Sequence, residues 1–134
     1  MIEEIRQYFI DNFDDLNPSG MFGVDYLGST PISYSIESGI GDPWLKKYTD
    51  GGGLKQFNFL FTSREWFGSN AINNAENLKF YDYISKRIEE LNELGVLPEV
   101  DGAAYIEVLT NGYLISAEAD NAKYQIQLRL VYTK

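Results

Sequence analysis

Two of the most versatile catalytic side chains are absent from this sequence. The 134-residue chain contains no histidine and no cysteine. Without histidine there is no Ser-His-Asp or Cys-His centre, and the commonest transition-metal ligand is missing. Without cysteine there are no disulfides, no thiolate nucleophile and no zinc-thiolate site. Any catalysis would therefore depend on carboxylates, and any stacking on a ligand would depend on aromatic rings.

Two loop motifs resemble ligand sites only in part. Asp15–Gly20 begins like a calcium loop, but the twelfth position is Tyr26 instead of glutamate, and Pro18 lies inside the loop. Asp50–Lys55 is rich in glycine but lacks the Gly-Lys-Ser/Thr ending of a phosphate loop. We therefore expect a helix-ending turn and a hairpin tip at these places, and neither a metal nor a cofactor.

Paired carboxylates can run hydrolysis without histidine. The candidate pairs Asp14/Asp15 and Glu89/Glu90 fall on expected helix ends or solvent faces, where carboxylates are usually only solvated. Aromatic residues near the expected hairpin could stack on a sugar or a base, although core or interface roles are commoner. These are Trp44, Tyr48, Trp66 and Phe67. No catalytic residue is assigned, and the sequence favours an assembly or binding role over an enzyme.

The net charge of −9 is concentrated near the start of the chain. Residues 1–45 contain eight acidic residues and one basic residue, Arg6. Affinity for phosphate backbones comes mainly from Lys and Arg, so direct nucleic-acid binding is not expected. The charge either serves solubility or forms an acidic surface that meets a basic partner.

The chain is expected to be one soluble domain over residues 1–134 that is made inside the cell. Its first residues, Met1–Arg6, are acidic and amphipathic, unlike a signal peptide. No apolar run approaches the roughly 18–20 residues of a membrane span, so no membrane partner is expected.

Hydrophobic periodicity predicts two helices, at about residues 2–14 and 74–94. Short alternating segments predict strands. These are residues 23–27, 32–37, 44–48, 55–66, 104–109, 113–116 and 123–133. Asn111-Gly112 favours a hairpin between two of them, although a continuous bent strand is an alternative. The order predicts an α+β fold in which two helices pack on one face of a twisted antiparallel sheet.

Lys55–Trp66 is the strand that defines the core. Phe57, Phe59 and Phe61 share one face, because successive side chains of a strand point in opposite directions. The final strand, Lys123–Thr133, alternates in the same way. If both strands share the sheet, the face away from the rings carries amides, a hydroxyl and two arginines. We expect a solvated face, a subunit interface or the lumen of a ring to be formed by Gln56, Asn58, Thr62, Arg64, Gln125, Gln127 and Arg129.

Several segments, in this order, also carry a resemblance to a known family. They are Ile2–Ile10, Val24–Gly28, Tyr34–Glu37, Asp42–Pro43, Lys46–Tyr48, Asp50–Gly52, Gln56–Phe59, Ser63–Glu65, Glu76–Asn77, Phe80–Tyr81, Gly95–Pro98, Gly112–Leu114 and Ala122–Leu130. The chain resembles the small minor-capsid and tail-completion proteins of long-tailed phages and prophages of Gram-positive bacteria, in particular their tail terminators.

The resemblance implies an antiparallel sheet with helices on one side, and a ring, expected to be a hexamer. This ring would cap the tail-tube protein and join it to head-completion proteins in the tail or neck of the virion, after assembly in the host cytoplasm. The family brings no catalytic residues. Two alternatives remain open: another neck or head-completion ring protein, or an acidic intracellular binding module, such as an immunity-like inhibitor of a basic protein.

Overall fold

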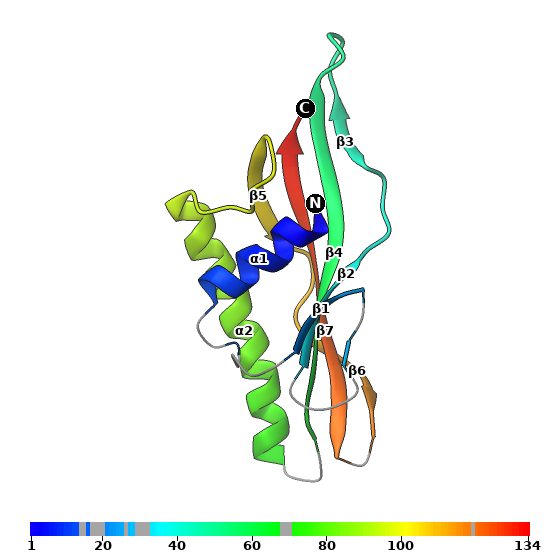
Figure 1. The fold of residues 1–134 in the computed structure, drawn as a ribbon, viewed down its shortest axis with the longest axis vertical. Helices are drawn as coiled ribbons and strands as arrows, with labels where there is room; N and C mark the ends of the chain where they lie inside the picture. The colour runs from blue at the N-terminus through cyan, green and yellow to red at the C-terminus, as the bar shows by residue number, and fades with distance from the viewer. Residues whose placement is uncertain (14–15, 17–20, 26, 29–32, 68–70, 119) are drawn as a thin grey trace.

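The computed structural model describes residues 1–13, 16, 21–25, 27–28, 33–67, 71–118 and 120–134. Figure 1 shows a long twisted sheet with both helices on one face and a hairpin that extends past the helices at one end. The predicted α+β class is therefore confirmed. The elements are α1 (Ile2–Asn12), β1 (Met21–Val24), β2 (Ser33–Ser38), β3 (Trp44–Lys47), β4 (Gly53–Trp66), α2 (Ala71–Leu94), β5 (Ala103–Val108), β6 (Tyr113–Ala117) and β7 (Asn121–Thr133).

Two long antiparallel strands, β4 and β7, form the axis of the seven-stranded sheet. They pair without interruption from Leu54↔Thr133 to Trp66↔Asn121. Each has two short partners on its outer edge: β2 and β3 flank β4, and β5 and β6 flank β7. The two most strongly alternating segments of the sequence are thus direct neighbours.

The sheet is mixed, and the prediction of a wholly antiparallel sheet is wrong at one edge. β1 pairs with β2 in parallel, from Met21↔Ser33 to Val24↔Ile36. Parallel neighbours need a connection that crosses a face of the sheet. Gly28 lies in that connection, between β1 and β2. Its carbonyl is fixed to the sheet by hydrogen bonds from Arg64 Nε at 2.8 Å and Ser33 Oγ at 3.2 Å.

The core lies between the helices and the face of the sheet that carries the phenylalanine rings. Phe59 and Phe61 are buried and Phe57 is half-buried, as the alternation predicts. Helix α1 contributes Ile5, Tyr8 and Phe9, and Phe13 follows directly after the helix. Helix α2 contributes Tyr81, Ile84, Ile88 and Leu91, and β7 contributes Tyr124, Ile126, Leu128 and Leu130. Each fully buried apolar side chain stabilises this arrangement by about 1.5–3 kcal/mol.

The apolar stripe of α2 differs from the prediction at its first member. Leu78 is 44% exposed and does not belong to the core. Asn77, one turn before Tyr81, faces the sheet instead, where its Nδ2 donates to the Trp66 carbonyl at 2.8 Å. A polar contact to the end of β4 therefore replaces the expected apolar one.

The segments β5 and β6 do not form a hairpin with each other. Both pair with β7, at Ala103↔Tyr132 to Val108↔Leu128 and at Tyr113↔Gln125 to Ala117↔Ala122. They therefore follow each other along one edge, so the predicted hairpin is wrong. The arrangement is close to the alternative of a continuous bent strand, with a break between Val108 and Tyr113. Gly112, between them, packs directly on the Tyr81 ring of α2.

The expected hairpin between β3 and β4 is confirmed. Trp44 pairs with Lys55 and Lys47 with Gly53. In the turn, Tyr48 N donates to the Gly52 carbonyl at 2.8 Å, and Gly51 has a φ of 92°, which glycine adopts at no steric cost. Of the predicted turn Asp15–Gly20, every residue except Leu16 lies outside the described residues.

Candidate functional site

The sheet face opposite the helices, termed here the open face, carries all seven residues singled out in the sequence. The registers Asn58↔Arg129 and Thr62↔Gln125 place the side chains of β4 and β7 side by side. Gln127 is exposed, Asn58 and Gln125 are half-buried, and Thr62 is fully buried. Only part of the predicted face is therefore available to a partner.

The three glutamine amides and the hydroxyl of the open face are bonded within the chain. Gln125 Nε2 and Gln127 Nε2 donate to the Tyr113 hydroxyl at 2.6 Å and 2.9 Å. Thr62 Oγ1 donates to the Ser35 carbonyl at 3.2 Å. Because these hydrogen bonds are already made, covering the face removes fewer hydrogen bonds to water than free amides would lose.

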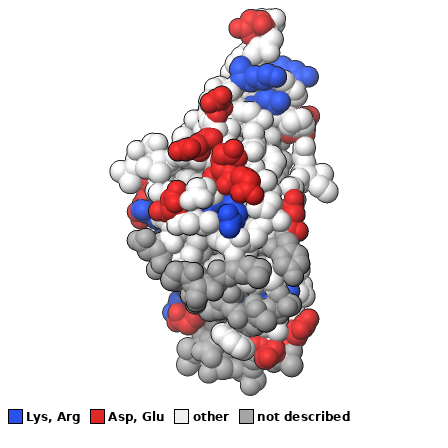
Figure 2. All heavy atoms as spheres, in the orientation of Figure 1, with Lys and Arg blue, Asp and Glu red and all other residues white. Residues whose placement is uncertain are grey.

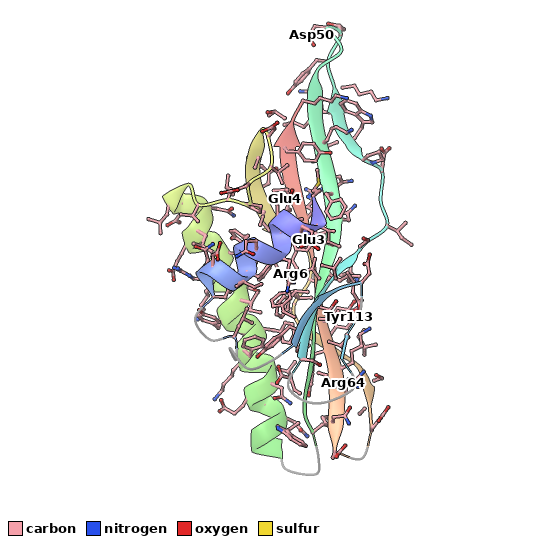
Figure 3. All side chains as sticks on the ribbon, in the orientation of Figure 1. Glu3, Glu4, Arg6, Asp50, Arg64 and Tyr113 are labelled. Atoms are coloured by element: carbon pink, nitrogen blue, oxygen red, sulfur yellow. The ribbon has the colours of Figure 1, made fainter. Side chains whose placement is uncertain are left out.

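Both arginines of the open face hold the sheet together. Besides Gly28, Arg64 contacts Asn121, with Nη1 donating to Oδ1 at 2.8 Å. Arg129 pairs with Glu107 on β5, with Nε 2.9 Å from Oε2, and its Nη1 donates to Gln56 Oε1 at 3.1 Å. These guanidinium groups are charge-neutralised or bonded inside the chain, and they link β4, β5 and β7. Figure 3 labels Arg64 and Tyr113 on the lower half of the sheet.

A hollow of about 390 Å³ lies near the middle of the open face. It is lined by Asn58, Leu60, Gln125 and Gln127, where β4 and β7 pass between their short lateral partners. Two apolar side chains border it, Ile40 at 101% exposure and Leu109 at 43%. Exposed apolar residues around a recess are typical of surfaces that contact another protein.

The segment that carries Ile40 is fixed to β4. Gly39 N donates to the Asn58 carbonyl at 2.8 Å, and a Cβ on Gly41 would lie 1.9 Å from Asn58 Nδ2. A side chain at position 41 would therefore have to displace the Asn58 amide. Ile40, between the two glycines, is fully exposed. In the sequence, the feature that could have indicated an exposed Ile40 is its place as a single isoleucine between two glycines. The signal for Leu109 was alternation with Tyr105 and Glu107, which lie on the same face.

A cluster of basic and aromatic residues, termed here the lysine tip, lies along the β3–β4 hairpin, below the turn that carries Asp50. Lys47, Lys55 and Lys134 place their Nζ atoms 5.2, 4.9 and 5.9 Å from the centre of the Trp44 ring. Lys46 Nζ lies 5.5 Å from the Tyr48 ring. Figure 2 shows this basic cluster near one end of the molecule, with acidic residues over the middle of the same face. Trp44 and Tyr48 are two of the predicted stacking residues, whereas the lysines beside them were not predicted.

An acidic recess of about 480 Å³, termed here the acidic groove, lies between α1 and residues 96–99. Glu3, Glu4, Asp11 and Glu99 line it. Figure 3 shows Glu3 and Glu4 on α1, below the hairpin tip that carries Asp50. Glu4 pairs with the N-terminal amine at 2.9 Å, and that hydrogen bond lowers its pKa. The groove collects part of the negative charge of the first 45 residues.

No protein-family model and no curated protein matches this chain.

Neither a metal centre nor a membrane span is visible where the structure is described. Within those residues, no three acidic side chains are placed so that they could hold one metal ion. No helix among them is long and apolar enough to cross a membrane. The pairs Asp14/Asp15 and Glu89/Glu90 are not brought to a common site: the first lies outside the described residues, and Glu89 and Glu90 are exposed on α2.

One carboxyl group is strongly perturbed. Burial raises the pKa of Glu65 to about 7 from 4.5, while a hydrogen bond with Ser63 acts in the opposite direction. Ser63 Oγ lies 2.6 Å from the hydroxyl of Tyr81, whose pKa burial also raises. Glu65 lines neither the hollow of the open face nor the acidic groove. Glu65 is a half-buried acid next to the core, on the same face of β4 as Ser63.

The raised pKa makes stability depend on pH at Glu65. The folded chain holds this proton up to about pH 7 and the unfolded chain only to about 4.5, so the contribution of Glu65 is most favourable below 4.5 and is lost as the pH rises through 7. As the pH rises from about 5 to about 8, we expect the free energy of unfolding of Glu65→Gln to increase by about 2–3 kcal/mol relative to that of the native chain. Residual contact of Glu65 with water limits the effect. Urea unfolding of both proteins at the two pH values measures this. A stability difference that is the same at both would contradict the assignment.

Proposed function

We propose that this chain is a structural subunit that self-associates into a ring, of the kind that ends the tail tube of a long-tailed phage and joins it to head-completion proteins. The observation that carries the proposal is the hollow of the open face, where Ile40 and Leu109 stay exposed beside internally bonded amides. The resemblance of the segment order to that of tail terminators supports the same function. A hexamer in the tail or neck of the virion, assembled in the host cytoplasm, follows from that resemblance.

The open face suits contact with a neighbouring subunit. Its apolar border gains free energy when it is covered, at about 25 cal/mol for each Å² removed from water. Its amides keep their hydrogen bonds to Tyr113, so covering them leaves few polar groups unsatisfied. Thr62, Arg64 and Arg129 support the sheet beneath this contact, whereas Gln127 lies on its surface.

The acidic groove favours a second candidate. A recess with four carboxylates could cover basic side chains of another protein, as an acidic inhibitor or immunity-like module would. Such a module is expected to be a monomer with one tight basic partner, whereas a terminator or another neck protein self-associates. Self-association therefore separates the two candidates.

The variant Ile40→Asp with Leu109→Asp tests the open face. Two charges on the contact surface must be desolvated on association, so we expect self-association to weaken about tenfold or more. Ile40 is fully exposed, so the fold should not change. Light scattering after size-exclusion chromatography, over a concentration series, measures the effect.

Leu78→Asp provides the matched control. Leu78 is 44% exposed, against 43% for Leu109, but lies on α2 in the opposite layer. It should leave self-association unchanged. Equal association of all three proteins would remove the open face from the subunit contact, and a monomeric native chain that binds one basic protein would favour the inhibitor.

A further inference from the structure

The lysine tip is a local excess of positive charge on a protein with a net charge of −9. Four of the eleven basic residues lie in it, and Lys46, Lys47 and Lys134 are exposed. None of the four ammonium groups has a carboxylate within 4.0 Å among the described residues. We infer that the lysine tip inserts into the acidic groove of a second copy of this chain, an inference that rests on the proposed self-association.

The tip is preorganised for an acidic partner. Three ammonium groups surround the single ring of Trp44, and the ring's electron-rich faces attract them despite their mutual repulsion. Lys55 is held by the register of the sheet, opposite Trp44 and Tyr132. Carboxylates placed among these groups would relieve the like-charge repulsion. The cluster lies around β3, in the part of the molecule that extends past the helices, and this position allows it to reach another molecule (Figure 1).

The groove has an unmet requirement for a donor besides its negative charge. Tyr8 lines it and is only 3% exposed, yet its hydroxyl has no hydrogen-bond partner in the part of the chain that the structure describes. Burial raises the pKa of Tyr8 far above its ordinary value, so the hydroxyl stays neutral and can accept a hydrogen bond. Lysine supplies three donors and no acceptor. An inserted ammonium group would pair with the carboxylates of the groove. To bond Tyr8 as well, it must displace the side chains that bury the hydroxyl oxygen.

Charge and shape favour a second copy over a nucleic acid. The tip carries four lysines and the groove four carboxylates, so both halves of the contact are present on one chain. Glu4 already pairs with the N-terminal amine and Glu3 lies 4.0 Å from Arg6, whereas Asp11 and Glu99 have no basic partner within 4.0 Å among the described residues. A phosphate backbone would instead meet the acidic remainder of the protein. The apolar rim of the groove, with Val96 at 37% exposure, offers a surface for Trp44 or Tyr48. Because tip and groove are different patches, their contact can repeat from copy to copy and close a ring.

Charge reversal with rescue tests the contact. The tip variant is Lys47→Glu with Lys55→Glu, and the groove variant is Glu3→Lys with Glu99→Lys. Each should weaken self-association about tenfold or more at about 0.05 M salt, and less at about 0.5 M, where surface charges are screened. The chain with all four substitutions should recover association, because the charges are again opposite. Sedimentation velocity reports all three, and circular dichroism checks that each is folded.

Lys79→Glu with Lys86→Glu is the matched control for the tip variant. It lowers the net charge by the same amount as that variant, but on the exposed side of α2. It should leave association unchanged. Equal association of the native chain and either reversed variant would overturn the tip contact while leaving the ring intact. A native chain that never self-associates, with or without tail tubes, would overturn the proposed function itself.

Zero-length carbodiimide crosslinking identifies the contacting residues. In a mixture of ¹⁴N- and ¹⁵N-labelled chains, we expect inter-chain links from tip lysines to Glu3, Asp11 or Glu99. Inter-chain links that avoid these residues would contradict the inference. Binding of a fluorescent single-stranded oligonucleotide by the native chain, and its loss in the tip variant, would assign the tip to nucleic acid instead.

Discussion

Phe61→Ala is expected to lower the free energy of unfolding by about 3–5 kcal/mol, the range for removing a buried aromatic ring. Phe61 is fully buried at the centre of the core. It stacks on Phe9 with the ring centres 5.1 Å apart, and also contacts Phe22 and Tyr34, each at 5.9 Å. Alanine would leave a cavity between α1 and the sheet that these rings cannot close. Chemical denaturation followed by tryptophan fluorescence measures the loss.

Phe57→Ala is the control for this prediction. Phe57 lies on the same face of β4 but is half-buried, and its ring contact is with Phe59 at 6.4 Å. It should cost less than half as much as Phe61→Ala. Equal losses at both positions would show that the core is not centred where α1 meets the sheet.

Gly112→Ala is expected to lower the free energy of unfolding by about 3 kcal/mol, as overpacking of a tight site does. An added Cβ would lie 2.3 Å from Tyr81 Cβ and 2.4 Å from its Cγ. These atoms are next to the α2 backbone and cannot rotate away. The far end of the ring is also fixed, because its hydroxyl is bonded to Ser63 at 2.6 Å. Denaturant titration of the two proteins gives the difference.

Asn111→Ala is the neighbouring control, since Asn111 is exposed. It should change stability by no more than about 0.5 kcal/mol. If Gly112→Ala were as harmless as Asn111→Ala, the close approach of the β5–β6 connection to α2 would be wrong.

The central part of the fold could be predicted because it depends on local alternation. Phe57, Phe59 and Phe61 can share a core only if β4 turns its odd-numbered face to the helices, and a slip of one residue would expose all three. The same argument assigns Tyr124, Ile126, Leu128 and Leu130 of β7. These side chains are buried where the pattern places them, except for the half-buried Phe57.

The edges of the sheet could not be predicted, because edge pairing depends on distant neighbours. Asn111-Gly112 is a strong hairpin signal, but β7 is long enough to pair with both β5 and β6, and Tyr81 occupies the space beside Gly112. The parallel pairing of β1 with β2 likewise depends on the crossing at Gly28, which no periodicity reveals.

The residues that share the open face were predicted from the sequence, but the contacts among them were not. Alternation is sufficient to bring Gln125 and Gln127 together with Asn58. It could not show that Glu107 neutralises Arg129, because that pair depends on the register of β5. For the lysine tip, the hairpin was predicted but the lysine contacts were not. The register of that hairpin places Trp44 opposite Lys55.

Electron microscopy of negatively stained protein tests the central claim most directly. The purified chain should be imaged alone at low salt, and with tubes assembled from the major tail-tube protein of the same genome. We expect closed rings of uniform diameter, and one ring at the end of each tube. A chain that stays monomeric in both samples and leaves the tube ends bare would contradict the proposal.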